Sequence, residues 1–187
     1  MHVSLENLSQ DHRTIERVLD VMQQAAHELL ASRPVDPSLL RQSVACLSDL
    51  LDGCHWRKEE EFLFPALLTA RSFVEDRLIE ELRADHVRVR RALSEVRAAF
   101  SRLDAGHPGG GWAVAVALAA CYAPLRMHLH AEEQAAFALA QQVLGVEKLD
   151  QLAVTFGQID AAQEHPDQWR ALYERVTVNA ETAKPRI

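Results

Sequence analysis

The chain has 187 residues, of which 48% are apolar and 25% are charged, and its formal net charge is −7. This length and composition predict one soluble globular domain that can bury a proper core. The acidic balance and the lack of a basic cluster argue against nucleic acid as a partner.

The rest of the composition argues against a membrane or a disulfide framework. The longest uncharged run, residues 112–125, is shorter than the roughly 20 residues that a membrane span needs. The N-terminus lacks the basic-then-apolar layout of a signal peptide. Cys46, Cys54 and Cys121 are odd in number and form no CxxC pair. We therefore expect a reduced, cytoplasmic protein with no membrane partner.

The first half of the chain carries two stretches in which apolar residues recur every three or four positions, as in amphipathic helices. The first stripe covers residues 5–29 and ends at "SRPVDP". Asp36 predicts an N-cap, with Pro37 at the first position of a second helix. The stripe of that helix covers residues 40–62, and Pro65 is expected to kink it near its end.

The second half carries two further stripes with the same period. Ser72 and Glu75 form a capping box, which predicts the start of a third helix with its stripe over residues 78–103. "AGHPGGG" follows and predicts a turn. The fourth stripe covers residues 114–139, and Pro124 is expected to bend its helix.

Four long helices joined by short loops predict an all-α fold, an up-down-up-down four-helix bundle. We expect the bundle to occupy residues 1–145, closed by Gly145. Residues 146–187 contain two shorter helical patterns, about 147–156 and then "HPDQWRALYERVTVNAE". We expect them to form a C-terminal extension that packs on the bundle.

The two halves of the chain repeat one another. "DHRTIERVL" in the first half corresponds to "DHVRVRRAL" in the second, and "HWRKEEEFLFP" corresponds to "HLHAEEQAAFA". Each half therefore contributes one histidine from its first helix and one HxxxE pair from its second. Residues four apart project from the same helix face, so the histidine and the glutamate of each pair point the same way. The set consists of His12, His55, Glu59, His86, His128 and Glu132.

Four imidazoles and two carboxylates on stripes that face the bundle axis are costly to bury unpaired. Metal ions would satisfy all six groups at once. Imidazole and carboxylate without thiolate suit iron, manganese or zinc, and six protein ligands exceed a tetrahedral zinc site. The set fits two metals, each held by two histidines and bridged by the two glutamates. Open positions would remain for a bridging oxygen species and a small external ligand.

These motifs, in this order and spacing, resemble the hemerythrin-like, or HHE cation-binding, family over about residues 5–145. The resemblance implies a four-helix bundle with two non-haem iron ions, joined by a bridging oxo or hydroxo group, that reacts with oxygen, peroxide or nitric oxide. Arg90 stands where oxygen-carrying hemerythrins have a fifth histidine, and Glu132 stands in place of their aspartate. The set is more similar to that of bacterial HHE proteins and of the di-iron domain of iron–sulfur cluster repair proteins.

Several functions stay open at this stage. The first is reversible binding or sensing of oxygen or nitric oxide, and the alternatives are peroxide decomposition by a catalase-like enzyme, iron storage and iron-centre repair. A purely structural role for the metals is disfavoured by the open coordination positions. The expected partner is a small molecule, and the oligomeric state is left open.

Other polar residues near the set have less defined roles. A fifth ligand is left open among Glu60, Glu133, Glu16, Asp52 and Tyr122. Asp11 and Asp85 precede two of the histidines and either orient neighbouring groups or stay exposed. His130 lies two residues past His128 and is expected to face away from the centre.

Overall fold

A computed structural model describes residues 1–70 and 73–162 of the chain, and the regular structure within these ranges is entirely helical. Three of the elements are π-helical turns (η), which interrupt otherwise α-helical rods. The elements in chain order are α1 (Val3–Leu30), α2 (Pro37–Leu50), η1 (Leu51–His55), α3 (Trp56–Lys58), η2 (Glu59–Leu63), α4 (Phe64–Thr69), α5 (Phe73–Asp104), α6 (Gly110–Ala131), η3 (Glu132–Ala136), α7 (Phe137–Val143) and α8 (Val146–Ala161).

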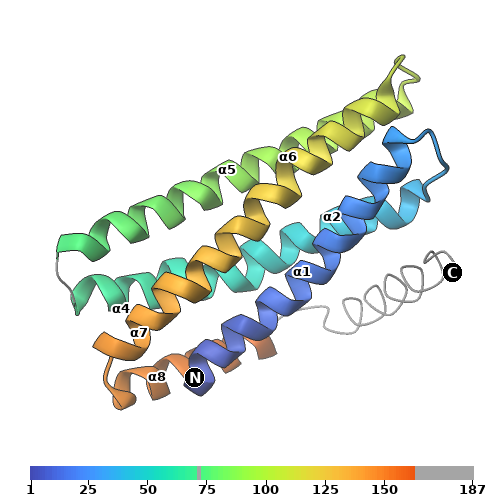
Figure 1. Ribbon diagram of the computed structural model, residues 1–187. Helices are drawn as coiled ribbons and strands as arrows, with labels where there is room; N and C mark the ends of the chain where they lie inside the picture. Colours follow the sequence, from blue (N-terminus) through green and yellow to red (C-terminus); the bar gives the residue numbers. More distant parts are fainter. Residues whose placement is uncertain (71–72, 163–187) are drawn as a thin grey trace, which may run out of the picture.

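Four long rods form the molecule (Figure 1). They are α1, the continuous run from α2 to α4, α5, and the continuous run from α6 to α7. Successive rods run in opposite directions, and α6 packs against both α1 and α5. This arrangement confirms the predicted all-α, up-down-up-down bundle.

Local signals in the sequence account for several helix ends. The Asp36 side chain accepts hydrogen bonds from the backbone N–H groups of Ser38 and Leu39 at 2.9 and 3.1 Å, so it caps α2 as predicted. Gly106 and Gly109 adopt φ values of 72° and 74° in the turn before α6, a conformation that favours glycine. The capping box expected at Ser72 lies outside the described residues.

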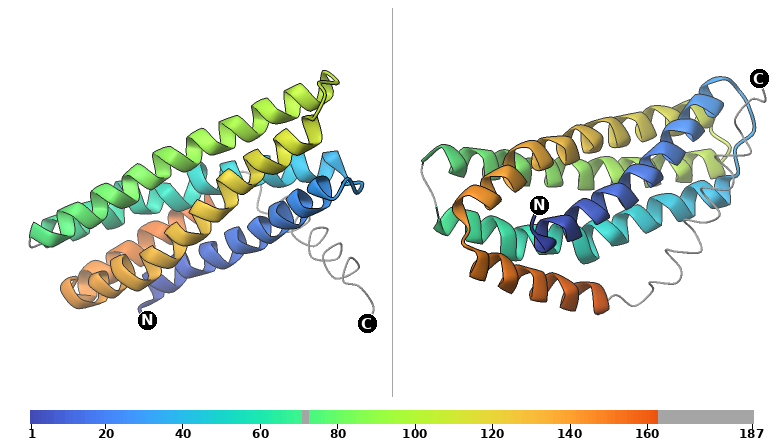
Figure 2. Two further views of the ribbon diagram at one scale, coloured as in Figure 1. Left: turned by 45° about the horizontal axis from the view of Figure 1, so that its top comes forward. Right: turned by 60° about the horizontal axis from the view of Figure 1, so that its bottom comes forward.

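The helix after the bundle matches the first of the two short C-terminal patterns. α8 packs across the outside of the bundle against α1 (Figure 2). Leu149, Leu152, Phe156 and Ile159 recur every three or four residues and are buried on its inner face. The second pattern, which begins at His165, lies outside the described residues.

The rod from α6 to α7, residues Gly110–Val143, is long and apolar enough to cross a membrane by length and composition alone. Core helices of bundles pass the same test, because one face of such a helix is buried against its neighbours. Here Leu118, Cys121, Leu125 and His128 supply that buried face.

A π-helical turn explains why the fourth predicted stripe is wrong beyond Glu132. The fourth stripe was expected to continue from Glu132 through Ala135 and Leu139, yet Ala136 and Ala140 are buried instead. A π turn inserts one extra residue into an α-helix, so every later residue on the inner face is displaced by one. η3 begins at Glu132 and supplies that extra residue.

Both prolines expected to disturb a rod lie within continuous helix. Pro65 is the second residue of α4, directly after η2. Proline has no N–H and crowds the preceding turn, and a widened turn gives its ring room. Pro124 lies inside α6, which continues past it to Ala131. The rods therefore continue through both prolines.

The apolar core divides into two clusters, one on each side of a polar layer. Leu8 of α1 and Leu82 of α5 belong to one cluster. Ile15 of α1 and Val89 of α5 belong to the other. Between these residues lie His12 and His86, so the predicted ligand set falls at the boundary of the two clusters.

Candidate metal centre

All four rods contribute to the polar layer. None of the six predicted residues is more than 3% exposed. They are His12 on α1, His55 at the end of η1, Glu59 at the start of η2, His86 on α5, His128 on α6 and Glu132 at the start of η3. The structure therefore brings together the whole set that the repeat singled out.

The six side chains form two groups of four donors that have two members in common. One group contains His12 and His55, the other contains His86 and His128, and Glu59 and Glu132 belong to both. Within each group the donor atoms all lie within 4.8 Å of one another, a spacing at which they could hold a metal ion. Each histidine pair comes from one hairpin, and the shared carboxylates come from both.

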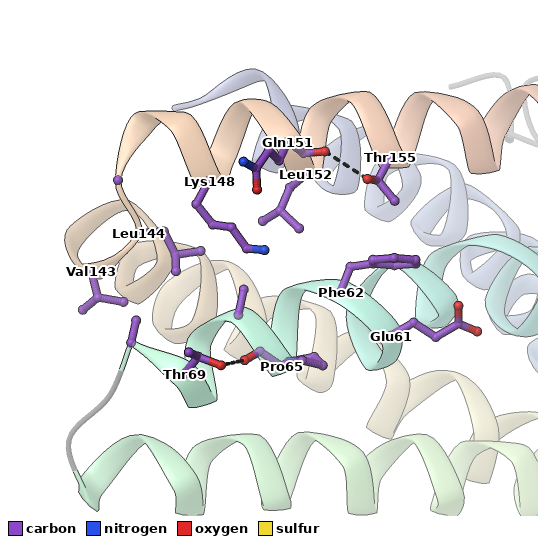
Figure 3. Close-up of a pocket in the computed structure, with 13 residues that line it drawn as sticks. Glu61, Phe62, Pro65, Thr69, Val143, Leu144, Lys148, Gln151, Leu152 and Thr155 are labelled. Atoms are coloured by element: carbon purple, nitrogen blue, oxygen red, sulfur yellow. Dashed lines mark hydrogen bonds between the residues drawn. The ribbon is translucent and has the colours of Figure 1, made fainter.

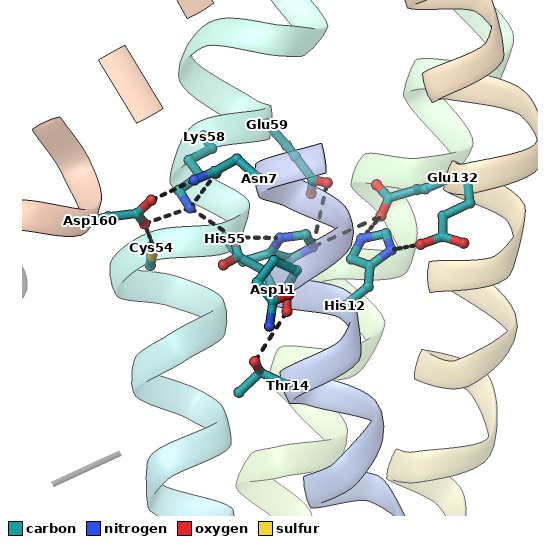
Figure 4. Close-up of polar contacts among 12 residues, drawn as sticks. Asn7, Asp11, His12, Thr14, Cys54, His55, Lys58, Glu59, Glu132 and Asp160 are labelled. Carbon is teal, nitrogen blue, oxygen red and sulfur yellow. Dashed lines mark hydrogen bonds and ion pairs between the residues drawn. The ribbon is translucent and has the colours of Figure 1, made fainter. Parts of the chain in front are cut away.

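Glu59 and Glu132 each face histidines of both hairpins. Glu59 places Oε1 3.4 Å from Nε2 of His55 and Oε2 3.5 Å from Nε2 of His86. Glu132 places Oε2 3.4 Å from Nε2 of both His12 and His128. Figure 4 shows the carboxylates of Glu59 and Glu132 beside the rings of His12 and His55.

The inner atoms of this cluster lack partners that would explain their burial. Nε2 of His12, Nε2 of His55 and both carboxylate oxygens of Glu59 and Glu132 are fully buried without a hydrogen bond. Buried polar atoms in native proteins nearly always have a partner. Six such atoms converge on one region, which is the arrangement expected of donor atoms around bound cations.

Burial and mutual repulsion set the protonation of the metal-free cluster. Burial and the neighbouring Glu132 carboxylate raise the pKa of Glu59 well above its usual value. Burial lowers the pKa of His55 to about 4, against the opposing effect of Asp11. Burial also lowers the pKa of His128. The imidazoles of His55 and His128 are therefore neutral at pH 7, which is the form that binds metals.

The outer nitrogen of each of the four clustered histidines faces a carboxylate. Nδ1 of His12 donates to Oε1 of Glu133 at 3.1 Å, and Nδ1 of His86 donates to Oε1 of Glu60 at 2.6 Å, because a carboxylate can only accept. The other two contacts are longer, at 3.5 Å. They join Nδ1 of His55 to Oδ2 of Asp11 and Nδ1 of His128 to Oδ2 of Asp85.

These outer contacts follow the internal repeat. Asp11 and Asp85 each face the second-helix histidine of their own hairpin. Glu60 and Glu133 each face the first-helix histidine of the other hairpin. An acid at Nδ1 favours the tautomer that carries its proton on that nitrogen. The Nε2 atoms of the four rings face the shared glutamates, and those of His86 and His128 lie 3.1 Å apart.

The five residues left open as a fifth ligand lie outside both four-donor groups that the described residues form. They are Glu60, Glu133, Glu16, Asp52 and Tyr122. Glu16 accepts a hydrogen bond from Arg126 at 2.8 Å, and Asp52 accepts one from Arg90 at 2.7 Å. Arg90 also donates to Glu60 at 3.2 Å, so it supports an outer carboxylate.

Aromatic rings stack on one histidine of each hairpin, His12 and His86. Phe137 stacks on His12 with ring centroids 5.2 Å apart, and Phe64 stacks on His86 at 5.8 Å. Phe64 and Phe137 directly follow η2 and η3, so each π turn is followed by the ring that covers a histidine. Trp56 also stacks on His86, with ring centroids 4.7 Å apart. These rings restrict water around the centre.

A second polar cluster behind His55 was missed in the sequence. Lys58 is fully buried and binds Asn7, Asp11 and Asp160. The helical spacing could have indicated it, because Lys58 lies three residues after His55 on the same face. Asp160 similarly lies four residues after Phe156 on the inner face of α8.

His130 is exposed, as predicted from its position on α6. A pocket of about 590 Å³ opens elsewhere, between α4 and α8 (Figure 3). Phe62, Pro65, Lys148 and Thr155 are among the residues that line it, and none of the six clustered residues does. This pocket is separate from the candidate metal centre.

Buried histidine and carboxylate donors that project inward from all four rods define a metal-binding helical bundle. The family model for the hemerythrin HHE cation-binding domain matches residues 3–140, so the chain belongs to this family. The family binds iron, usually as a di-iron pair. No curated protein and no solved structure matches the chain.

Proposed function

We propose that the protein is a non-haem di-iron protein that binds or senses oxygen, nitric oxide or a related small oxygen species. The observation that carries this proposal is the sharing of Glu59 and Glu132 by two four-donor groups. A site built for one ion would not need two histidine pairs that face the same two carboxylates from opposite hairpins.

In this proposal His12 and His55 would hold one ion, and His86 and His128 would hold the other. Glu59 and Glu132 would be shared by both ions, because each has contacts with histidines of both pairs. Two irons would supply redox chemistry and coordination positions that are open to a small ligand. The negative charges of the two glutamates offset part of the charge of the paired cations.

The surroundings favour a small ligand over a large one. The six residues are buried, and the rings of Phe64, Phe137 and Trp56 stack on His12 or His86. The described pocket large enough for an organic molecule lies apart from them. A diatomic molecule or peroxide fits this enclosed, largely apolar setting, whereas a large organic substrate does not.

The test loads the metal-free protein with Fe²⁺ without oxygen and follows visible absorption as oxygen, nitric oxide or hydrogen peroxide is added in separate experiments. We expect new absorption bands with oxygen or nitric oxide, and their decay when the gas is removed. Absence of any spectral change with all three would contradict the proposal. Sustained release of oxygen from peroxide would instead favour the peroxide-decomposing alternative. The His128→Ala variant is the control.

A further inference from the structure

A buried ammonium group lies directly behind the first histidine pair. Lys58 of α3 is 0% exposed, and its Nζ donates to Asn7 Oδ1 at 2.8 Å and Asp11 Oδ2 at 2.8 Å. Its third contact is an ion pair with Asp160 Oδ1 of α8 at 2.6 Å. An ammonium has three hydrogens, so these contacts use its full donor capacity.

The contacts of Lys58 join three separate segments of the chain (Figure 4). Asn7 Nδ2 donates to Asp160 Oδ2 at 2.6 Å, and Cys54 Sγ donates to Asp160 Oδ1 at 3.1 Å. Asp160 is thus held by α1, η1 and α3 at once. It fastens the end of α8 to the rods that carry His12 and His55.

Asp11, Cys54 and Asp160 also have the spacing of a metal site. The Lys58 ammonium already supplies the cation between the two carboxylates. Burial alone would lower the pKa of Lys58, but the charge of Asp11 and the other acidic neighbours raise it, so the group is charged. This cluster is therefore an ion-pair network and not a third metal site.

The network continues to the candidate metal centre through Asp11. The same oxygen that accepts from Lys58, Oδ2, lies 3.5 Å from Nδ1 of His55. An acid in this position orients the imidazole, and its own placement depends on its other partners. Lys58 is the partner that holds this carboxylate, which is only 14% exposed.

We propose that Lys58, anchored by Asp160 of α8, is a positioning residue that fixes Asp11 against His55 and couples the docking of α8 to the first metal position. The proposal rests on the proposed function, because it assumes that His55 is a ligand. It assigns a role to α8, which lies outside the repeated hairpins.

Within the described residues the second hairpin has no equivalent of the Lys58 network, so the two proposed metal positions are inequivalent. Ala131 occupies the position in the repeat that corresponds to Lys58, and it is exposed. Asp85, the counterpart of Asp11, pairs with Arg88 on the surface and is 30% exposed. Loss of the Lys58 network should therefore alter the orientation of the His55 imidazole and leave that of His128 unchanged.

The first experiment uses metal-free protein labelled with ¹⁵N at its histidine rings. Lys58→Met and Asp160→Ala are compared with wild type and with Asp150→Ala, a matched control in α8 whose carboxylate pairs with His2. We expect the ring nitrogen resonances of His55 to shift in the first two variants, with those of His128 unmoved in all three. Unmoved His55 resonances in these variants, or equal shifts at His55 and His128, would overturn the proposal.

The second experiment titrates the same proteins with Co²⁺ and follows visible absorption. Disrupting a residue that orients a metal ligand typically weakens metal binding about 10–100-fold. We expect that loss for one of two binding steps in Lys58→Met and Asp160→Ala, and for neither step in Asp150→Ala. Equal weakening of both steps would contradict the inference. Asp160 is 37% exposed, so Asp160→Ala decides the matter if Lys58→Met does not fold.

The third measurement uses the reciprocity of coupled equilibria. If docking of α8 strengthens metal binding, metal binding must slow the opening of α8, which amide hydrogen exchange detects. We expect Co²⁺ to slow exchange in α8 of wild type and Asp150→Ala, but not of Lys58→Met. Equal slowing in Lys58→Met would refute the coupling. If wild type binds no pair of Co²⁺ ions, the proposed function fails, while the metal-free resonances still decide the role of Lys58.

Discussion

Glu59 and Glu132 are the residues whose burial conflicts most with stability of the metal-free chain. Both are 0% exposed, and their carboxylate oxygens have no hydrogen-bond partner. Two buried carboxylates side by side repel each other, so one of them holds a proton when no cation is present. Such an arrangement is expected where function, and not folding, selects the residue.

A Glu59→Gln variant tests this conflict through its pH dependence. The raised pKa of Glu59 means that the folded protein keeps a proton that the unfolded chain releases above its usual pKa of 4.5. That stabilising contribution is complete below pH 4.5 and is lost as the pH rises. Glutamine removes the effect, so the metal-free variant should exceed wild type at pH 8 by about 1–3 kcal/mol in the free energy of unfolding.

Urea unfolding at pH 5 and pH 8, in the presence of a chelator, measures the difference. The gain should be smaller at pH 5 than at pH 8. The same variant should bind metal less well, because a neutral amide cannot supply the charge or the second anionic oxygen of a bridge. A variant that is less stable than wild type at pH 8 would show that Glu59 is not strained in the metal-free protein.

The contrast between the buried His128 and the exposed His130 on α6 gives a second prediction about single residues. His128 is buried among the clustered donors, whereas His130 is exposed two residues later. His128→Ala should lower the metal content of the purified protein, and His130→Ala should leave it unchanged. Metal analysis of both variants gives the answer, and an equal loss in both would mean that the inward face of α6 is assigned to the wrong residues.

The π-helical turns are the element whose position the sequence did not predict. Apolar spacing correctly predicted four rods and the helix α8, and the Asp36-Pro37 pair correctly predicted the N-cap of α2. It placed the fourth stripe one residue off beyond Glu132, because spacing rules assume a uniform α-helix. A sequence feature that η2 and η3 share appears only when the two halves are aligned. In each half the HxxxEE motif is followed, four residues after its second glutamate, by a phenylalanine, Phe64 or Phe137.

The widened turn in η3 lets two consecutive glutamates contact the same histidine. In a π turn consecutive residues are closer together around the axis than in an α turn, since each turn holds more residues. Glu132 can therefore face the centre while its neighbour Glu133 reaches Nδ1 of His12. Phe137 then covers the same histidine.

Deleting Gln134, an exposed residue within η3, tests this role. The deletion should restore an ordinary α turn without rotating the buried faces on either side, because a π turn is a one-residue insertion. We expect a folded protein whose thermal midpoint changes by only a few degrees, roughly the effect of 1 kcal/mol. Metal binding should fall, since Glu132 and Glu133 no longer face His12 together.

Deletion of Gln142, an exposed residue in the ordinary α turns of α7, is the matched control. It should rotate Leu144 and the start of α8 away from their packing and destabilise the fold far more. Circular dichroism melting and iron content of both deletions separate the outcomes. Full iron content after deletion of Gln134 would mean that the π turn has no role in the centre.

At the scale of the whole molecule, the repeat explains why the six clustered residues could be predicted and the network behind them could not. Both hairpins present the same donors, so His12 and His86, or Glu59 and Glu132, support one another as predictions. Lys58 has no counterpart in the second hairpin, and Asp160 belongs to α8 outside the repeat. A signal based on internal symmetry cannot find residues that break it.

The same symmetry predicts which of the two proposed metal positions each single substitution weakens. Glu59→Ala and Glu132→Ala should each weaken both metal positions, because each glutamate contacts histidines of both hairpins. His55→Ala should weaken mainly one position and leave the other partly occupied. Iron content and the spectroscopic signature of coupled iron in the three variants provide the readout. An intact coupled pair in Glu132→Ala would show that the carboxylates are terminal ligands.

The central claim is that the bundle holds two metal ions bridged by Glu59 and Glu132. Iron analysis combined with low-temperature Mössbauer spectroscopy of the iron-reconstituted protein tests it most directly. We predict about two irons per chain, as one per four-donor group requires, and a spectrum in which the two ions are magnetically coupled. One tightly held zinc without a second site, or two irons that show no coupling, would contradict the account.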